Sequence, residues 1–463
     1  MNRRRFLSVS AATAAALPTA MGAAEASLEG ALHDEPGPPR QPPSAAETVS
    51  LALIGCGGRG TMLIQSFVKH PNVRVAWVCD PEAARMDVVA DWLQKNAGQT
   101  PKHAADMRRV LDDRDVDAVI IATPEHWHGL ATVWACQAGK DVYVEKNASL
   151  GIWEGRRMIQ AARRHGRIVD VGTQNRSAPY NMAARDYIRS GRLGKVLLVK
   201  VFNLQGGGRW SAQPDSAPPP GLDWDLWLGP APKVPYNPGR HRSWGDYWEY
   251  CGGTFSGDGS HQLDLARMVM GDPPPPRLIT CSGGRFQYDD GRVMPDLLEI
   301  TYDYGGWLMT MENGTFSPYM DKIAWDVRDS DLFPYWPQCA TRIEIYGTEG
   351  LMFLGRHGGG WQVFGKAKSQ SRPAEVVAQM PGRFPDVPHQ RDFLECVRTR
   401  RRPTADIEVA HESANLIHYG VAAYRSGERR LAYDANSETF DRPAANRFLK
   451  PHYRKGFEIP DRA

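Results

Sequence analysis

Residues 49–60 read VSLALIGCGGRG, a largely apolar strand pattern that runs directly into three closely spaced glycines. Gly55, Gly57 and Gly60 form a G-x-G-x-x-G pattern, and the next ten residues, TMLIQSFVKH, have helical spacing. Such glycines permit a tight turn, close approach of the backbone to a pyrophosphate and close helix–strand packing, while the helix N-terminus attracts the anion. The stretch therefore predicts a dinucleotide-binding loop, which also includes Gly58 and Arg59.

A second strand pattern strengthens this prediction. Residues 73–80, VRVAWVCD, end in Asp80, which lies 20 residues after Gly60. An acidic side chain at this distance accepts hydrogen bonds from the adenosine ribose hydroxyls and repels a 2′-phosphate. We therefore expect NAD rather than NADP as the cofactor. A glycine-rich turn without a ligand is the alternative, and the context of strand, helix and acidic residue argues against it.

The alternation of strands and helices continues to residue 172. Helices are expected over residues 81–95, 105–112, 128–139 and 151–166, and strands over residues 117–124, 141–146 and 167–172. Strands that alternate with helices form a parallel, doubly wound α/β sheet, which binds ligands beyond the carboxyl ends of its strands. The pattern predicts a Rossmann domain over residues 48–172.

A lysine stands at one of these carboxyl ends. The strand DVYV is followed by Glu145, Lys146 and Asn147. An ammonium is rarely buried without a partner or a purpose, so its position at the ligand-binding edge indicates a functional role. An ion pair with Glu145 or a helix C-terminus is the structural alternative.

The second half of the chain has a different pattern. Five strand-like segments separated by Gly or Asp turns, with few helices between them, begin near residues 277, 296, 306, 341 and 351. They predict an α+β domain over residues 173–463 with one large, open, mostly antiparallel sheet. Residues 205–250 form a long segment rich in Pro, Gly and Trp. Its tryptophans either face a sugar ring or anchor the segment to the domain; they are Trp210, Trp224, Trp227, Trp244 and Trp248.

Residues 252–271, GGTFSGDGSHQLDLARMVMG, form a second candidate chemical centre. Spacings of three place Asp258, His261 and Asp264 on one face of a predicted helix. A histidine titrating near neutrality can take a hydroxyl proton, and a nearby carboxylate can orient it. A satisfied core histidine is the alternative for His261, and a structural pair is the alternative for Asp264.

Four segments together resemble the Gfo/Idh/MocA oxidoreductase family: the glycine loop, ATPEHWHG, VYVEKN and GGTFSGDGSHQLDL. The resemblance extends over the chain from Thr48 onward. It implies that Lys146 contacts the substrate hydroxyl beside the nicotinamide and that His261 is the catalytic histidine, with Asp258 displaced by one position from the family aspartate. Asn147 stands where the family has proline. The implied cofactor contacts beyond the glycine loop and Asp80 are Thr123, Pro124, His126, His128, Glu145, Lys146 and Gln174.

Two further expectations come from the same resemblance. The open sheet supplies subunit contacts in the family, so a homodimer or homotetramer is expected. His126 and His128 have the spacing of a metal pair, but the resemblance places their loop along the cofactor, and no metal site is expected.

The N-terminus, MNRRRFLSVSAATAAALPTAMG, has a basic start followed by a short Ala-rich apolar run. It resembles a twin-arginine signal and is too short for a spanning helix. Residues 1–47 are therefore interpreted as this signal and a Pro-rich tether. Recognition by the twin-arginine export machinery and a periplasmic location follow, with NAD carried out tightly bound because free cofactor is scarce there.

Composition excludes several other classes. The chain has 463 residues and a formal net charge of +3, which disfavours a nucleic-acid partner. Its seven cysteines include no CxxC motif, so neither a disulfide framework nor a structural zinc site is expected.

The function predicted from these features is NAD-dependent oxidation of a secondary alcohol, or reduction of a ketone, on a sugar, glycoside or polyol. Two alternatives remain open at this stage. One is an NAD-dependent glycoside hydrolase that works by oxidation, elimination and reduction. The other is a non-catalytic sugar-binding protein that keeps the cofactor as a structural element.

Overall fold

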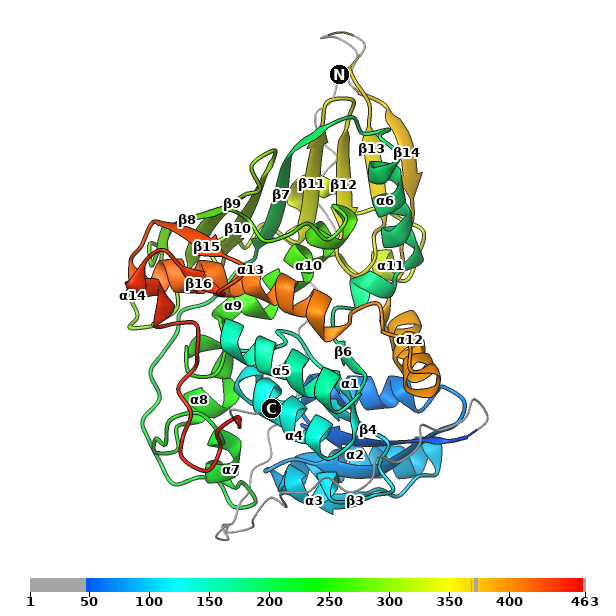
Figure 1. The fold of residues 1–463 in the computed structure, drawn as a ribbon, viewed down its shortest axis with the longest axis vertical. Helices are drawn as coiled ribbons and strands as arrows, with labels where there is room; N and C mark the ends of the chain where they lie inside the picture. The colour runs from blue at the N-terminus through cyan, green and yellow to red at the C-terminus, as the bar shows by residue number, and fades with distance from the viewer. Residues whose placement is uncertain (1–46, 368, 370–373, 461–463) are drawn as a thin grey trace, which may run out of the picture.

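The computed structural model describes residues 47–367, 369 and 374–460, and it contains two sheets that follow one another along the long axis of the molecule (Figure 1). The predicted export signal and nearly all of the predicted tether lie outside these residues. Along the described residues, no helix is both long and apolar enough to cross a membrane.

The first sheet has six strands, all parallel, in the order β3-β2-β1-β4-β5-β6. Four of the strands, β1, β4, β5 and β6, have no exposed residue, as expected where helices cover both faces. The predicted Rossmann sheet is thus confirmed. The strand bounds are β1 (Val49–Ile54), β2 (Val73–Cys79), β3 (Lys102–Ala104), β4 (Ala118–Ile121), β5 (Asp141–Val144) and β6 (Val169–Val171).

Helices from both halves of the chain cover this sheet. The local ones are α1 (Gly58–Phe67), α2 (Ala83–Ala97), α3 (Met107–Leu111), α4 (His128–Gln137) and α5 (Ile152–Arg164). Helix α12 (Asp386–Thr399) comes from the second half, and its Phe393 packs edge-on against Phe67 and Tyr143. The core of the first sheet is therefore completed by a distant segment.

The second sheet has ten strands in the order β14-β13-β12-β11-β7-β10-β9-β8-β15-β16. Every described pairing is antiparallel except that of β7 with β10, so the prediction of a mostly antiparallel sheet is confirmed. The bounds are β7 (Val196–Leu204), β8 (Leu278–Gly284), β9 (Leu297–Asp303), β10 (Leu308–Gly314), β11 (Arg342–Gly347), β12 (Leu351–Gly355), β13 (Trp361–Phe364), β14 (Val376–Met380), β15 (Arg430–Asp434) and β16 (Thr439–Phe440).

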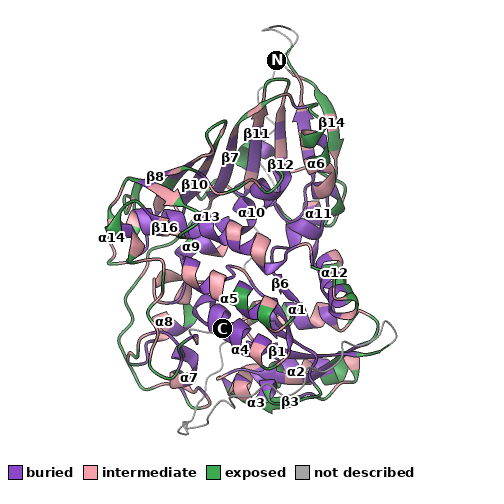
Figure 2. Cartoon of the chain, in the orientation of Figure 1, coloured by how far each residue is buried: buried purple, intermediate pink, exposed green. Residues whose placement is uncertain are grey.

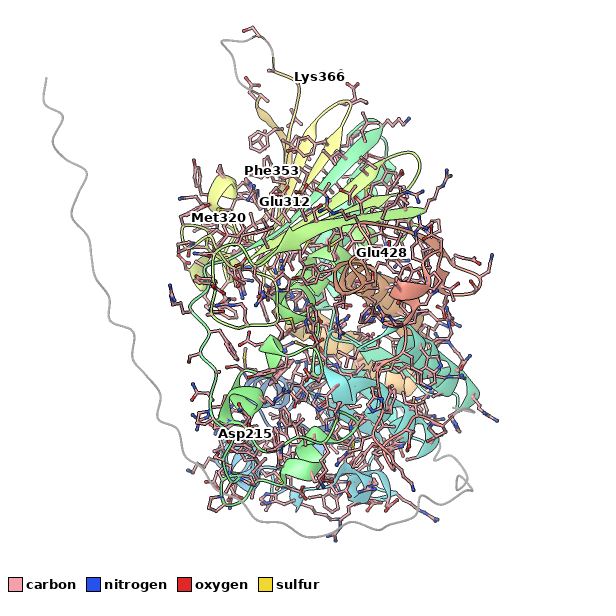
Figure 3. All side chains as sticks on the ribbon, turned by 90° about the vertical axis from the view of Figure 1, so that its left-hand side faces the viewer. Asp215, Glu312, Met320, Phe353, Lys366 and Glu428 are labelled. Carbon is pink, nitrogen blue, oxygen red and sulfur yellow. The ribbon has the colours of Figure 1, made fainter. Side chains whose placement is uncertain are left out.

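One face of the second sheet is covered by helices α6 (Pro179–Arg189), α10 (Gly259–Val269) and α13 (Ile407–Ser426). Helix α10 lies between the two sheets and is buried along its whole length (Figure 2). Glu312 and Phe353 project from the opposite face, which is turned away from these helices (Figure 3). The remaining helices are short: α7 (Trp224–Leu228), α8 (Pro238–Arg242), α9 (Gly253–Gly257), α11 (Trp325–Arg328) and α14 (Pro443–Asn446).

The Trp-rich segment, residues 205–250, lies beside the first sheet (Figure 1). Backbone bonds from Ala83 to Gly221 and from Asp223 to Pro81 attach it to the start of α2. Trp224 and Trp227 stack with ring centroids 4.6 Å apart inside a small apolar cluster. These two tryptophans anchor the segment, as one of the two readings of the sequence expected.

Candidate active site

A cavity of about 340 Å³ lies at the carboxyl ends of the first sheet's strands. The glycine loop and Asp80 form one side, and Thr123, Pro124, Glu145 and Lys146 lie along its lining as well. The Trp-rich segment lines another side of the cavity with a group of large side chains, Leu226, Trp227, His241, Arg242 and Trp244. The predicted loop, the predicted strand ends and the long insert therefore meet at one place.

The glycine loop has the shape that a dinucleotide requires. A Cβ atom at Gly55 would lie 2.6 Å from the Ala122 carbonyl carbon, and one at Gly60 would lie 1.9 Å from the Gly55 oxygen. A Cβ at Gly58, in contrast, would meet nothing within 4 Å. Helix α1 thus begins at an open part of the cavity wall, where its first amides and dipole favour a diphosphate. The residues present fit NAD.

Backbone amides, one of them in the glycine loop, position the Asp80 carboxylate. Its Oδ2 accepts a hydrogen bond from the Cys56 amide at 2.8 Å, and its Oδ1 accepts one from the Glu82 amide at 2.9 Å. Burial raises the pKa of Asp80 to about 6, although Arg85 and these two amides oppose the rise. The carboxylate lines the cavity and is placed to accept ribose hydroxyls.

Arg59 and Glu145 line the cavity but also pair with each other. Arg59 Nε lies 2.7 Å from Glu145 Oε1, and Arg59 Nη1 lies 2.8 Å from Asp386 Oδ2 on α12. Gln174, a further predicted cofactor contact, is buried and donates to Tyr143 at 3.2 Å. Gln174 is not among the residues that line the cavity, so its cofactor contact stays a prediction.

The histidine pair of the EHWHG segment is turned toward backbone carbonyls. His126 Nε2 lies 3.1 Å from the Trp227 oxygen, and burial lowers the pKa of His126 to about 3. His128 bridges the Asn147 and Thr123 oxygens at 2.7 and 2.9 Å, and burial also lowers its pKa. Neither ring lines the cavity. Both hold the loop and the lysine strand end in place, and direct cofactor contact stays a prediction for each.

Lys146 lies at the cavity wall directly after β5, and its peptide bond to Asn147 is cis. Glu125 is buried nearby, and its Oε2 accepts a hydrogen bond from Ser256 at 2.5 Å. Burial raises the pKa of Glu125 to about 7, against the lowering effect of the Lys146 ammonium. The ammonium also lowers the pKa values of His261 and Asp258, so Lys146 is within electrostatic reach of the second centre.

His261 is buried on α10, and its Nδ1 has no hydrogen-bond partner among the described residues. Its ring packs edge-on against His357, with centroids 4.2 Å apart. Burial, followed by the charges of Arg356 and Lys146, holds its pKa well below the usual range. The ring is therefore neutral near pH 7 and has a buried, unpaired nitrogen, and it is not among the residues that line the cavity.

Asp258 pairs with two cations rather than with the His261 ring. Its Oδ2 accepts a hydrogen bond from Lys322 at 2.5 Å, and its Oδ1 lies 2.9 Å from Arg356 Nη1. Burial favours the protonated form, but Arg356 and Lys322 outweigh it and keep the pKa of Asp258 well below its usual range. Asp258 thus positions two cations, while its backbone oxygen accepts the His261 amide.

Three residues of this centre were missed in the sequence: Lys322, Arg356 and His357. Arg356 and His357 belong to RHGGG, which follows β12, and the four residues from His357 to Gly360 all have positive φ. Three consecutive glycines directly after a strand are a signal that could have been read as a strained functional loop. Lys322 stands in a loop with no comparable pattern.

The comparison with known families decides the relationship. The model of the oxidoreductase family with an NAD-binding Rossmann fold, GFO_IDH_MocA, matches residues 49–173. The model of that family's C-terminal alpha/beta domain matches residues 183–314 and 357–459. This chain belongs to the Gfo/Idh/MocA family.

Similarity to individual proteins is consistent with this membership of the Gfo/Idh/MocA family. It is 26% identical over 385 residues to scyllo-inositol 2-dehydrogenase (NAD(+)) of Bacillus subtilis, which covers 81% of this chain and 95% of that protein. It is 30% identical over 184 residues to a glycosyl hydrolase family 109 protein of Solibacter usitatus, covering 35% and 41%. The structure of aldose-aldose oxidoreductase from Caulobacter crescentus is similar with a TM-score of 0.61 and 18% identity, covering 83% of this chain and all of that one.

Asp264 and the tryptophans of the Trp-rich segment have different surroundings in this Gfo/Idh/MocA chain. Asp264 forms a buried ion pair with Arg176, with the Nε and Oδ1 atoms 2.7 Å apart, as the structural alternative expected. The tryptophans of the segment separate: Trp227 and Trp244 line the cavity, whereas Trp210 packs near Tyr247 and Trp248 near Tyr424. Within the described residues, no group of three or more His, Cys, Asp or Glu side chains is arranged to hold a metal.

Proposed function

We propose that this protein is an NAD-dependent oxidoreductase that transfers hydride between the cofactor and a secondary alcohol or ketone of a sugar, glycoside or polyol. The observation that carries this proposal is the position of Lys146. It lies in the wall of the dinucleotide cavity and also within electrostatic reach of a buried histidine that has an open nitrogen. Similarity to scyllo-inositol 2-dehydrogenase (NAD(+)) of Bacillus subtilis supports the same chemistry.

The residues divide the work as follows. NAD, when bound, supplies the hydride acceptor. Lys146 holds the reacting oxygen by a charge-assisted hydrogen bond and stabilises negative charge that develops on it. His261 takes the hydroxyl proton at Nδ1 as the alcohol becomes a ketone, and it returns that proton in the reverse direction. The low pKa of His261 keeps the ring in the neutral form that accepts a proton.

Cofactor retention is part of the proposal. The wall formed by the Trp-rich segment lies over the cavity, and Trp227 is held there by its stack with Trp224. A closed wall slows nucleotide release, which suits an enzyme exported to the periplasm as a folded protein with NAD inside. The arginine run Arg3-Arg4-Arg5 near the N-terminus supports export through the twin-arginine machinery.

We also propose a homo-oligomer in solution. The face of the ten-stranded sheet that bears Glu312 and Phe353 is turned away from helices α6, α10 and α13 (Figure 3), and the segment with α11 and Trp336 packs on its Phe353 end. On the edge of that face Leu308 is 41% exposed. A second copy of the chain, arranged as a dimer or tetramer, would cover this surface.

The deciding experiment measures reduced-nicotinamide absorbance and fluorescence of the purified protein before and after a panel of sugars, polyols and keto-sugars is added without cofactor. A spectral change with one compound class supports bound NAD that cycles on the enzyme. Release of chromophore from nitrophenyl glycosides without a net spectral change would favour the glycoside hydrolase instead. Absence of any response, with NAD present, would leave only the sugar-binding reading.

A further inference from the structure

Several buried polar atoms around His261 have no hydrogen-bond partner within the described residues. Arg356 is 7% exposed, and its Nε has no hydrogen-bond partner among the described residues. His357 is 5% exposed with an open Nε2, and His261 is 3% exposed with an open Nδ1. Buried polar atoms in native proteins almost always have partners. A cluster of orphaned ones beside a catalytic histidine therefore indicates a ligand that completes them.

The charge balance at this place is positive. The cations whose charges lower the pKa of His261 or of His357 are Arg59, Lys146, Lys322, Arg328 and Arg356. Among the described residues, the carboxylates that oppose them are Asp258, which pairs with Lys322 and Arg356, and Glu145 and Asp386, which pair with Arg59. Five cations thus face these three carboxylates, and burial raises the pKa of Glu125, another carboxyl near Lys146, to about 7.

The shape of the cationic group selects the anion. A guanidinium offers the N–H groups of its Nε and one Nη in a planar fork, which matches the two oxygens of a carboxylate. Arg356 Nη1 lies 2.9 Å from Asp258 Oδ1 in an ion pair, and the backbone after Arg356 forms the tight RHGGG turn, where a Cβ at Gly358 would lie 2.9 Å from Arg328 Cα. The open Nε of Arg356 is therefore presented in a fixed direction, as a preorganised site requires.

We propose that the substrate is an acidic sugar, that is, a uronic or aldonic acid, and that Arg356 binds its carboxylate while Lys146 and His261 act on a secondary hydroxyl. The inference rests on the proposed oxidoreductase function and names its substrate class. An anion at Arg356 also reduces the cationic field that holds the His261 pKa low, so the bound acid makes His261 a better proton acceptor.

The test compares matched acidic and neutral compounds: D-glucuronate with D-glucose, D-galacturonate with D-galactose, and D-gluconate with sorbitol. Nicotinamide fluorescence gives kcat/KM, and thermal unfolding of the NADH-bound protein gives binding without turnover. The acid of at least one pair should exceed its neutral partner about tenfold or more in kcat/KM and should raise Tm. R356Q should lower the ratio of acid to neutral kcat/KM about tenfold or more, while the variant still binds NAD.

The control is R189Q, which removes the same charge from a side chain that is 75% exposed on α6. It should keep the wild-type preference. Equal use of acidic and neutral sugars by the wild type and R356Q would overturn the inference and leave the oxidoreductase function standing. A different result would separate the two proposals: the NAD-loaded protein oxidises no member of the panel, but an acid raises Tm in the wild type and not in R356Q. That result would support the carboxylate site and overturn the proposed reaction.

Discussion

Arg59 and Glu145 form an ion pair, with Nε and Oε1 2.7 Å apart, that joins the start of the glycine-loop helix to the residue before Lys146. Asp386 on α12 completes the group from the second half of the chain. Burial by itself would raise the pKa of Glu145, but the charge of Arg59 outweighs burial. The pKa therefore lies below its usual range, and the carboxylate is ionised. The glycine loop and the segment that carries Lys146 are therefore joined through one partly buried salt bridge.

Replacement of Lys146 by Met should lower kcat by about 10²–10³-fold, because the oxygen loses its charged hydrogen-bond donor in the transition state. NAD affinity should change by less than about threefold, since Asp80 and the glycine loop remain. Steady-state kinetics and nucleotide fluorescence titration measure the two quantities separately. The matched control is Lys95→Met on the exposed side of α2, which should resemble the wild type. Unchanged turnover in Lys146→Met would remove the lysine from the mechanism.

The Asp80→Asn variant should bind NAD about 10–100-fold more weakly, because an amide accepts hydrogen bonds from the ribose hydroxyls less well than a carboxylate. The ratio of NADP affinity to NAD affinity should be higher than in the wild type, because the charge that repels the 2′-phosphate is gone and Arg85 stays beside the site. Titration with both nucleotides gives the ratio, and Asp91→Asn on exposed α2 serves as the control. An unaltered NAD to NADP ratio would contradict the assigned role.

NAD affinity should also depend on pH. Burial raises the pKa of Asp80 to about 6, and only the ionised form accepts two ribose hydroxyls. Binding should therefore be tightest above pH 6 and weaken as the pH falls through 6, approaching about tenfold per pH unit in the limit. Isothermal titration between pH 5 and pH 8 measures the effect. The Asp80→Asn variant should show a flatter profile; an identical slope in both proteins would assign the titration to another group.

Trp227→Ala should speed release of NAD and lower Tm, because the change opens the cavity wall and removes the stack on Trp224. Loss of a buried tryptophan typically costs about 3–5 kcal/mol. The fraction of purified protein that retains nucleotide, together with its dissociation rate, reports on the wall. Phe286→Ala, where the side chain is 71% exposed, controls for loss of an aromatic group. Equal retention in both variants would show that the wall does not hold the cofactor.

Glu154 gives a prediction about stability. It is buried on α5, where it accepts hydrogen bonds from Tyr453 and the Leu150 amide, and burial raises its pKa from 4.5 to about 7. The raised pKa means that the folded state binds the proton more tightly than the unfolded state does. This group therefore contributes stability below pH 4.5, and the contribution is lost as the pH rises to 7, on the order of 3 kcal/mol in total.

Urea unfolding of wild type and Glu154→Gln at pH 5 and pH 8 measures this effect. Glutamine cannot ionise, so the variant should gain stability relative to the wild type as the pH rises. Glu395→Gln, at a side chain that is 53% exposed, is the control and should show no such gain. A wild type that loses no stability relative to Glu154→Gln over this range would mean that Glu154 ionises normally.

Local sequence was enough to predict the first sheet and the centre of the site. The apolar run from Val49 to Ile54 is itself a strand pattern, and Asp80 and Lys146 each follow another one. Because the strand ends of a parallel sheet meet at one edge, these residues could be placed together. His261 was found in the same way from the spacing on α10. In contrast, the pairing of Asp258 with Arg356 and Lys322 joins residues that are far apart in the chain, and no local pattern reports it.

The amino-acid sequence by itself determined the order of elements, the glycine loop, the acidic residue after β2 and the lysine near a strand end, because each depends on backbone geometry over a few neighbouring residues. Tertiary structure decided the rest. It placed α12 against the first sheet, stacked Trp224 on Trp227 beside the cavity, and brought the Asp258–Arg356 ion pair to the centre that contains His261. These contacts depend on how distant surfaces pack and exclude water, which no short window of sequence contains.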